Sequence, residues 1–420
     1  MNRRLQMVAA SLLATFVAGQ VLAGDWPSWR GPNRDGISSE TGLLTEWPEG
    51  GPKLLWQVDG LGGGYSSLAI ADGKIYTMGR QGGGTHLIAL NQKEGEKLWA
   101  TSVGGGNPNC TPTVDGSLVY ALGRDGDLVC ADAQAGSVVW KKNFGKDFGG
   151  KMMSGWGYSE SPLVDGDLLI CTPGSGDAYI AALDKTSGRV IWKSGPTDAG
   201  FSRGRDGAAY SSVVVSKGAG VKQYIQLNGR GVFGVRASDG KFLWSYNKIA
   251  NGTANIPTPI IKGDYVFCST GYGTGAALLE LKKTDDGVSA EEVYFLPANK
   301  FQNHHGGMIL VGDYIFCGHG HNKGFPLCIE MMTGKKVWDG GRGPGAGSAA
   351  ILQADNHLYF RYENGVMALI ESTPAEYNLK GSFRIATADR KTRSWPHPVI
   401  SDKKLYLRDQ QILLCYDLAK

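Results

Sequence analysis

The chain repeats a unit of short strands and turns, and this repetition constrains the fold more than any other feature of the sequence. The clearest copy runs from Cys110 to Trp140, CTPTVDGSLVYALGRDGDLVCADAQAGSVVW, where apolar runs alternate with Asp-Gly, Arg-Asp-Gly and Ala-Gly. Such runs between turn signals are typical of short antiparallel strands. Further copies end at Trp99, Trp192, Trp244 and Trp338, and weaker ones end at Phe295 and Phe383. Since a period of about 40 to 50 residues is typical of propellers or solenoids, we interpret each copy as a four-stranded blade.

The two ends of the chain supply complementary parts of one more copy. Leu54 to Gln57 match the last strand of a blade without its first three strands, and the C-terminal run WPHPVISDKKLYLRDQQILLCYDL supplies three strands and stops. Joined, they would close a ring and hide its edge strands. We therefore predict an all-β fold over residues 53–420, an eight-bladed β-propeller of four-stranded antiparallel blades, in which Leu54–Gln57 pairs with the strand containing Leu413–Tyr416. Seven blades remain the alternative if the copy ending at Phe383 is misread.

Residues 1–23 have the pattern of a secretory signal peptide. Arg3 and Arg4 precede an apolar run, and Val21 and Ala23 precede Gly24, which is the order of charged, apolar and small residues in such leaders. We expect cleavage after Ala23, no membrane span in the mature chain, and a periplasmic or secreted protein; a retained membrane anchor is the alternative. Because Gly24 is not a cysteine, no lipid anchor is implied.

Residues 24–52, GDWPSWRGPNRDGISSETGLLTEWPEGGP, form a segment rich in Pro, Gly and Trp without strand periodicity. Trp26, Trp29 and Trp47 would be unusual in a loose tail, because large exposed apolar side chains are uncommon without a function. We therefore expect this segment, here named the arm, to lie ordered across the fold.

The cysteine count limits the disulfide bonds that the chain can form, and the net charge bears on its class of partner. Seven cysteines in an exported chain leave at least one unpaired, and most follow apolar strand runs as buried side chains do. Cys317 and Cys328 could face each other on neighbouring strands of one blade, so a disulfide between them is one alternative. A net charge of +4 without a basic run argues against nucleic acid as a partner, and we expect a monomer.

The repeat also resembles that of a known family. The segments ALNQKEGEKLW, CADAQAGSVVW, AALDKTSGRVIW, GVRASDGKFLW and CIEMMTGKKVW resemble the Ala-x-Asp-x-x-Thr-Gly-x-x-x-Trp repeat of propellers similar to the pyrroloquinoline quinone (PQQ) dehydrogenases. WPSWRGP resembles the arm of exported bacterial members, and the chain is also similar to the propeller lipoprotein of the outer-membrane β-barrel assembly machinery. The resemblance implies that the repeat tryptophans pack between blades; these are Trp56, Trp99, Trp140, Trp192, Trp244 and Trp338.

Turn lengths indicate which face of the ring carries a binding site. The first turns, such as Asp72-Gly73, and the third turns, such as Ser187-Gly188, are tight hairpins. The long connections between copies emerge with the second turns on the opposite face, here named the loop-rich face, where function concentrates. Our candidate ligand-binding residues there are Tyr65, Arg80, Asn109, Arg124, Tyr158, Glu160, Tyr210, Arg230, His304, His305, Arg361, Trp395, His397 and Arg408, with Asn255, His319 and His321 beside them. Alternatively, these polar side chains only line a wet channel mouth.

Two motifs suggest specific chemistry. Asn303-His304-His305 and Gly318-His319-Gly320-His321 belong to one copy and one face, and two or three of these imidazoles with an open position would suit zinc or copper. Incidental histidines in a Gly-rich hairpin are the alternative. Gly229 to Gly234 match a dinucleotide fingerprint but lie between two strands instead of opening a helix, so we discard that motif.

The sequence supports two functional hypotheses. The first is a non-catalytic exported propeller without a cofactor, which binds a protein, peptide or polysaccharide on the loop-rich face. The second is the activity that the family resemblance implies, a PQQ-dependent dehydrogenase of an alcohol or sugar that uses calcium. In that case Glu160 or Asp206 would be the base, and Arg80 or Arg124 would pair with cofactor carboxylates. The chain contains no adjacent cysteines and no CxxCH haem site, which favours the first hypothesis.

Overall fold

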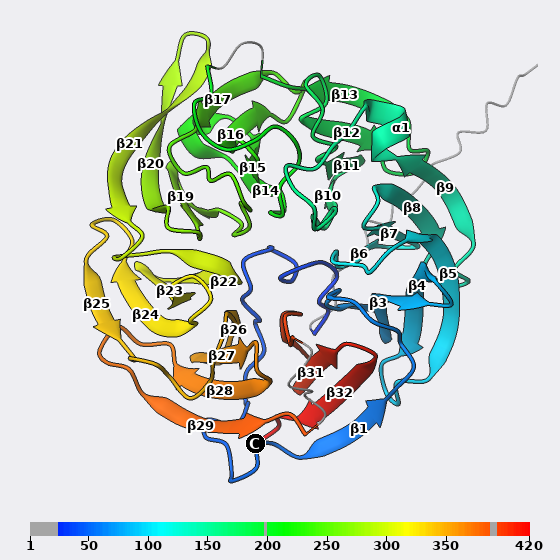
Figure 1. Ribbon diagram of the computed structural model, residues 1–420. Helices are drawn as coiled ribbons and strands as arrows, with labels where there is room; N and C mark the ends of the chain where they lie inside the picture. Colours follow the sequence, from blue (N-terminus) through cyan, green and yellow to red (C-terminus); the bar gives the residue numbers. More distant parts are fainter. Residues whose placement is uncertain (1–23, 197–199, 387–392) are drawn as a thin grey trace, which may run out of the picture.

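The structure, a computed structural model, describes residues 24–196, 200–386 and 393–420 (Figure 1). The expected leader at residues 1–23 lies outside the described residues. Over these residues the strands form eight four-stranded antiparallel sheets, arranged as blades around a central axis. The prediction of an eight-bladed propeller is confirmed.

Blades 1 to 4 follow one another in the sequence, each with its innermost strand first. Their strands are β2 (Ala69–Ala71), β3 (Lys74–Gln81), β4 (Gly84–Asn91) and β5 (Lys97–Gly105); β6 (Thr113–Asp115), β7 (Leu118–Leu122), β8 (Asp127–Asp132) and β9 (Val138–Asn143); β10 (Leu163–Asp165), β11 (Leu168–Cys171), β12 (Ile180–Asp184) and β13 (Val190–Ser194); β14 (Val214–Ser216), β15 (Gln223–Asn228), β16 (Gly231–Arg236) and β17 (Phe242–Tyr246).

Blades 5 to 7 repeat this order, and blade 8 combines both ends of the chain. Their strands are β18 (Ile260–Lys262), β19 (Tyr265–Thr270), β20 (Gly275–Thr284) and β21 (Gly287–Pro297); β22 (Asn303–Val311), β23 (Tyr314–His319), β24 (Phe325–Glu330) and β25 (Lys336–Asp339); β26 (Ala349–Ala354), β27 (His357–Tyr362), β28 (Val366–Glu371) and β29 (Leu379–Arg384); β30 (Val399–Ser401), β31 (Lys404–Asp409), β32 (Ile412–Asp417) and β1 (Leu54–Val58).

Blade 8 closes the ring as the sequence predicts. β1 pairs antiparallel with β32, with Leu54 opposite Tyr416 and Val58 opposite Leu413. In Figure 1 the blue β1 therefore lies beside the red β32. This pairing covers the sheet edge that an incomplete C-terminal blade would expose.

A tryptophan of one blade packs against the third turn of the next blade. A Cβ atom added at Gly136 would lie 2.6 Å from the Trp99 ring, and one at Gly188 would lie 2.8 Å from the Trp140 ring. Both glycines have positive φ, 73° and 69°, a conformation that glycine adopts without steric cost. The Gly and the Trp of the repeat are therefore two sides of the same contact between blades.

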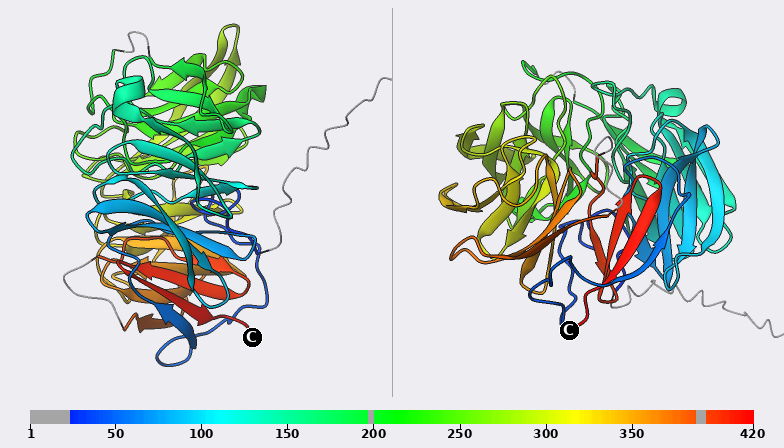
Figure 2. Two further views of the ribbon diagram at one scale, coloured as in Figure 1. Left: turned by 90° about the vertical axis from the view of Figure 1, so that its right-hand side faces the viewer. Right: turned by 60° about the horizontal axis from the view of Figure 1, so that its bottom comes forward.

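The arm enters the centre of the ring (Figures 1 and 2). Trp26 exchanges backbone hydrogen bonds with Ile70 of β2, and the backbone of Ser38 donates to Gln353 of β26. Further along, Trp47 is buried against Phe383, with ring centroids 5.2 Å apart. The arm thus contacts the innermost strands on both sides of the axis before it reaches β1.

Helices and disulfides contribute little to the described part of the chain. It contains a short helix α1 (Phe144–Phe148) and a 3-10 turn at Gly218–Gly220, and none of its helices is long and apolar enough to cross a membrane. All seven cysteines are described, buried and free. Cys317 lies opposite Leu327 and Cys328 opposite Phe316, so the two side chains point to opposite faces of the sheet and the disulfide considered for them does not form.

Candidate funnel on the loop-rich face

A cavity of about 390 Å³ opens at the centre of the loop-rich face. The innermost strands begin at this face, so their first residues and the connections before them surround the axis. We name this cavity the funnel. Aromatic and imidazole side chains form most of its wall, namely Trp29, Tyr65, Trp156, Tyr210, Tyr272, His304, His305, His321, Trp395 and His397.

The arm forms the floor of the funnel. Trp29 faces the cavity and meets the edge of the His397 ring, with centroids 5.6 Å apart. The next residue, Arg30, is buried and donates to the carbonyl oxygens of Asp35 and of Met308 in β22. Arg34 is also buried and donates to the Ser161 carbonyl at 2.6 Å. These two guanidinium groups fix the arm between blades 3 and 6.

A second cavity lies on the other side of the arm. It measures about 520 Å³ and is bounded by the arm, through Arg30 and Arg34, and by apolar residues of the innermost strands, such as Val214 and Ile260. The two cavities are therefore separate, and residues of the arm border both of them.

The aromatic wall is continuous across several blades. Trp395 lies between Tyr65 and His305, with ring centroids 4.6 and 4.8 Å from its own. His304 follows His305 at 4.7 Å, and the His321 ring lies 4.2 Å from that of His304. These side chains come from the starts of blades 1, 6 and 8 and from the second turn of blade 6. Rings at such separations pack favourably with one another, which keeps the wall in a fixed shape.

The histidines of the funnel are uncharged at neutral pH. Burial lowers the pKa of His304 and of His397 to about 3, and the neighbouring His321 ring and the Arg30 guanidinium group, respectively, lower it further. Burial also lowers the pKa of His305 well below its usual value. The His304 Nδ1 lies 2.7 Å from the hydroxyl of Ser348, which is itself buried. That hydroxyl orients the imidazole and is not placed to attack a ligand in the funnel.

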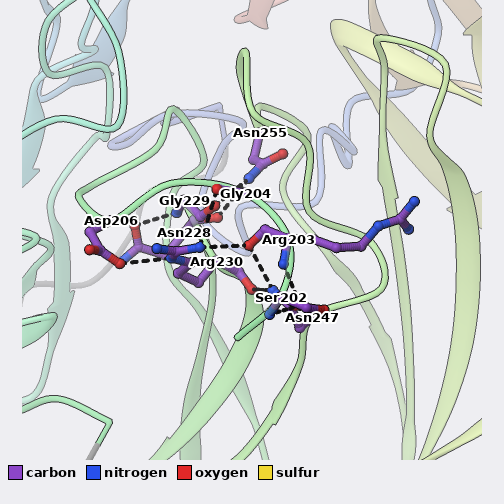
Figure 3. A network of polar contacts seen from close by, with 9 residues as sticks. All are labelled: Ser202, Arg203, Gly204, Asp206, Asn228, Gly229, Arg230, Asn247 and Asn255. Carbon is purple, nitrogen blue, oxygen red and sulfur yellow. Dashed lines mark hydrogen bonds and ion pairs between the residues drawn. The ribbon is translucent and has the colours of Figure 1, made fainter. Parts of the chain in front are cut away.

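Half of the predicted binding residues converge on the funnel. Those that line it are Tyr65, Asn109, Tyr210, His304, His305, Trp395 and His397. Arg80, Arg124 and Arg230 lie outside it on the same face. The Arg124 side chain donates to the Gly155 carbonyl at 2.9 Å. Figure 3 shows Arg230 paired with Asp206, at 2.7 Å between Nε and the carboxylate, so neither is free for the roles expected of them.

Four predicted residues lie beneath the face instead of on it. Arg361 and Arg408 are 0% and 1% exposed. Arg361 donates to the Pro396 carbonyl and Arg408 to the Gly62 carbonyl, at 2.8 and 2.7 Å. Tyr158 is buried against Phe144, and its hydroxyl donates to the Pro173 carbonyl. Tyr158 therefore belongs to the packed interior and not to the binding surface on which we expected it from the sequence.

Glu160 is the fourth of these buried residues. Its carboxyl oxygens accept hydrogen bonds from the backbone and the hydroxyl of Thr172, at 2.6 and 2.7 Å. Burial raises the pKa of Glu160 to about 8, against the opposing effects of Thr172 and of Arg34. Glu160 is 2% exposed and does not line the funnel, so it cannot reach a ligand there as a base. Asn255, also buried, donates to the Asn228 carbonyl (Figure 3).

The four histidines considered for a metal do not form one cluster. His319 turns toward Phe301 and accepts a hydrogen bond from the Gln302 backbone, while the His304 and His321 rings contact each other at an interplanar angle of 58°. Within the described ranges, no group of three or more His, Cys, Asp or Glu side chains is arranged to hold a metal ion.

Sequence comparison now identifies the family. A family model described as "Outer membrane protein assembly factor BamB" matches residues 87–340, more than half of the chain. The chain belongs to the BamB family. The curated BamB of Shewanella oneidensis is 24% identical over 237 residues, which cover 55% of this chain and 54% of that protein. A quinoprotein ethanol dehydrogenase of Pseudomonas putida is 27% identical over 143 residues, covering 31% and 22%. The chain thus matches about half or less of these relatives' lengths.

Solved structures of BamB proteins and of quinoprotein dehydrogenases share the fold. BamB from Moraxella catarrhalis superposes with a TM-score of 0.61 at 13% identity, covering 87% of this chain and 97% of that one. Quinohemoprotein alcohol dehydrogenase from Comamonas testosteroni superposes with a TM-score of 0.63 at 12% identity, covering 94% and 81%. At these identities the likeness establishes the architecture alone.

The funnel of this BamB-family chain does not have the ligand set of a calcium-bound quinone. Calcium takes several oxygen ligands, usually including carboxylates. Among the described residues that line the funnel there is no Asp or Glu. The one Lys or Arg among these described lining residues, Arg393, forms an ion pair with Glu363 and lies over the Trp395 ring. The residues present therefore do not fit PQQ with calcium.

Sequence reasoning missed three aromatic side chains of the funnel. Trp29 belongs to the arm, Trp156 to the connection between β9 and β10, and Tyr272 to the turn between β19 and β20. Trp156 is 55% exposed. Its place in a long connection on the loop-rich face was the available signal, because exposed aromatics in such loops often contact ligands.

Proposed function

We propose that this protein is a non-catalytic propeller that binds a partner molecule in the funnel of its loop-rich face. The observation that carries the proposal is the continuous aromatic wall of the central cavity. Its volume lies in the range of about 300 to 1,000 Å³ that is usual for ligand sites. Large aromatic side chains with a polar atom at one end are also enriched where proteins bind partners.

The chemistry of the wall supports binding over catalysis. The funnel has no carboxylate among its described residues, its histidines are neutral, and the two carboxylates considered as bases lie elsewhere. The curated relatives described as outer membrane protein assembly factors support a scaffold of this kind. We further infer, from the leader expected at residues 1–23, that binding takes place in the periplasm or outside the cell.

Site-directed photo-crosslinking in cells tests the proposal. A photoreactive phenylalanine derivative replaces Trp156 at the funnel rim or, as the matched control, the exposed Leu54 of β1 on the outer edge. We expect crosslinked adducts from position 156 and none from position 54. Adducts from position 54 alone, or none from position 156, would show that the partner does not use the funnel.

A further inference from the structure

The free polar groups of the funnel carry no charge. The Tyr65 hydroxyl and the Asn322 amide line the cavity without a hydrogen-bond partner among the described residues, and so do the indole N–H groups of Trp29 and Trp156. Arg393 is the one Lys or Arg among the described residues that line the funnel, and its ion pair with Glu363 has no net charge. A ligand with a net charge would therefore lose water without gaining an opposite charge, which is costly.

Aromatic surface is available on several sides of the funnel. Trp29 of the arm lines the cavity together with Tyr65, Tyr210 and the exposed Trp156. A ligand that leaves water here must present flat apolar faces to these rings, because the wall holds its shape through ring contacts and a hydrogen bond between the hydroxyls of Tyr210 and Ser154.

The same ligand must also satisfy hydroxyl, amide and indole groups. Tyr65 can donate and accept, Asn322 can donate and accept, and an indole N–H only donates. A ligand hydroxyl meets all of these, because it both donates and accepts. A carboxylate only accepts and an ammonium only donates, so each would leave part of the wall unsatisfied.

We infer that the funnel binds a sugar ring of an uncharged glycan. A pyranose combines apolar C–H faces with hydroxyl groups on its edge, which is the combination that the wall requires. Peptides usually bind by adding a strand to an exposed sheet edge, by laying an apolar helix into a continuous apolar groove, or by pairing with clustered charges. The free polar groups of the funnel are single uncharged side chains, which match none of these three modes. This inference rests on the proposed binding role of the funnel.

Titration of the purified protein with defined oligosaccharides tests the inference. The readout is tryptophan fluorescence, since Trp29 and Trp156 face the cavity. The neutral probes are cellotetraose, chitotetraose and maltotetraose; a tetragalacturonate and a tetra-alanine peptide represent acidic glycans and peptides. We expect saturable binding of a neutral probe that does not change with salt, because screening weakens only charge interactions.

Variants that remove one polar group connect binding to the funnel. Tyr65→Phe and Asn322→Ala should each weaken binding roughly 3- to 10-fold, the usual effect of one hydrogen bond. Tyr314→Phe is the matched control, because Tyr314 begins β23 outside the funnel and its hydroxyl has no partner among the described residues either. It should bind as the parent does.

Three results would overturn the inference: no neutral probe binds, the charged or peptide probe binds more tightly, or Tyr65→Phe and Tyr314→Phe lose affinity equally. The experiments can refute the inference without refuting the proposed function. A protein adduct from position 156 without glycan binding would retain the funnel as a binding site and refute the sugar. Neutral-glycan binding that is insensitive to Tyr65→Phe would place the sugar elsewhere.

Discussion

At the scale of single residues, tryptophans in this chain divide into those that hold blades together and those that face the ligand cavity. Trp140 is buried against Gly188 of the next blade, and its indole donates to the Lys185 carbonyl at 3.0 Å. Trp156 contacts little beyond the funnel rim and is 55% exposed. We expect Trp140→Ala to lower the free energy of unfolding by about 3–5 kcal/mol, the usual cost of a cavity left by a large side chain.

Trp156→Ala is the control for this prediction, and surface changes usually alter stability by about 0.5 kcal/mol or less. Chemical denaturation of both variants measures the difference. Equal losses would mean that Trp156 is part of the core, and a small loss for Trp140→Ala would mean that the contact between blades is not a major source of stability.

Glu160 makes the stability of the fold depend on pH in a way that a surface carboxylate would not. Because burial raises its pKa to about 8, the folded state keeps this carboxyl protonated where the unfolded chain has lost the proton. Its contribution to stability is full below about pH 4.3, the usual pKa of Glu, and is lost as the pH rises through 8. Glu160→Gln keeps the site uncharged, so its melting temperature should rise relative to the parent between pH 5 and pH 9. Parallel melting curves over that range would contradict the burial argument.

Side-chain direction explains which single residues the sequence could place. The repeat locates Tyr65, Tyr158 and Arg361 near the loop-rich end of their strands. It does not show whether a side chain points to the axis or between two blades. Tyr65 points to the axis, while Tyr158 and Arg361 point into the packed interior. That choice depends on neighbouring blades, and a single repeat carries no information about it.

At the scale of elements, the arm decides the shape of the binding cavity. Gly31 has a φ of 83°, and a Cβ atom there would lie 2.8 Å from the Trp26 ring, which is buried beside β2. Gly31→Ala should therefore lower the free energy of unfolding by about 1–3 kcal/mol beyond the effect of backbone strain, because the added methyl group overpacks against the Trp26 ring. Gly73→Ala is the matched control, with a φ of 68° and nothing within 4 Å.

Thermal melts of the two variants measure this difference. If Gly31→Ala melts no earlier than Gly73→Ala, the arm does not depend on the Trp26 contact for its position. The sequence predicted that the arm is ordered, from its tryptophans, but not that it enters the channel. Without strand periodicity, nothing in residues 24–52 indicates a direction, and the contacts of Arg30 and Arg34 with blades 6 and 3 are visible only in the closed ring.

At the scale of the whole molecule, the closed ring was predictable because the features that produce it lie within each repeat or at the two ends of the chain. Strand periodicity and turn signals define each blade, and the incomplete copies at the two ends require β1 to pair with β32. The funnel was predictable only in part. Turn lengths indicate its face, but its wall combines side chains from the arm and from distant blades, such as Trp29, Tyr272 and Trp395.

The central claim is that the funnel on the loop-rich face is where this protein binds its partner. Hydroxyl-radical footprinting, in cells and on the purified protein, tests this claim whatever the chemical class of the partner. Trp156 at the funnel rim is the reporter, and the exposed Met332, in the third turn of blade 6 on the opposite face, is the internal control. We expect oxidation of Trp156 to fall several-fold in cells while oxidation of Met332 stays the same. Equal oxidation of Trp156 in both samples, or protection of Met332 instead, would contradict the claim.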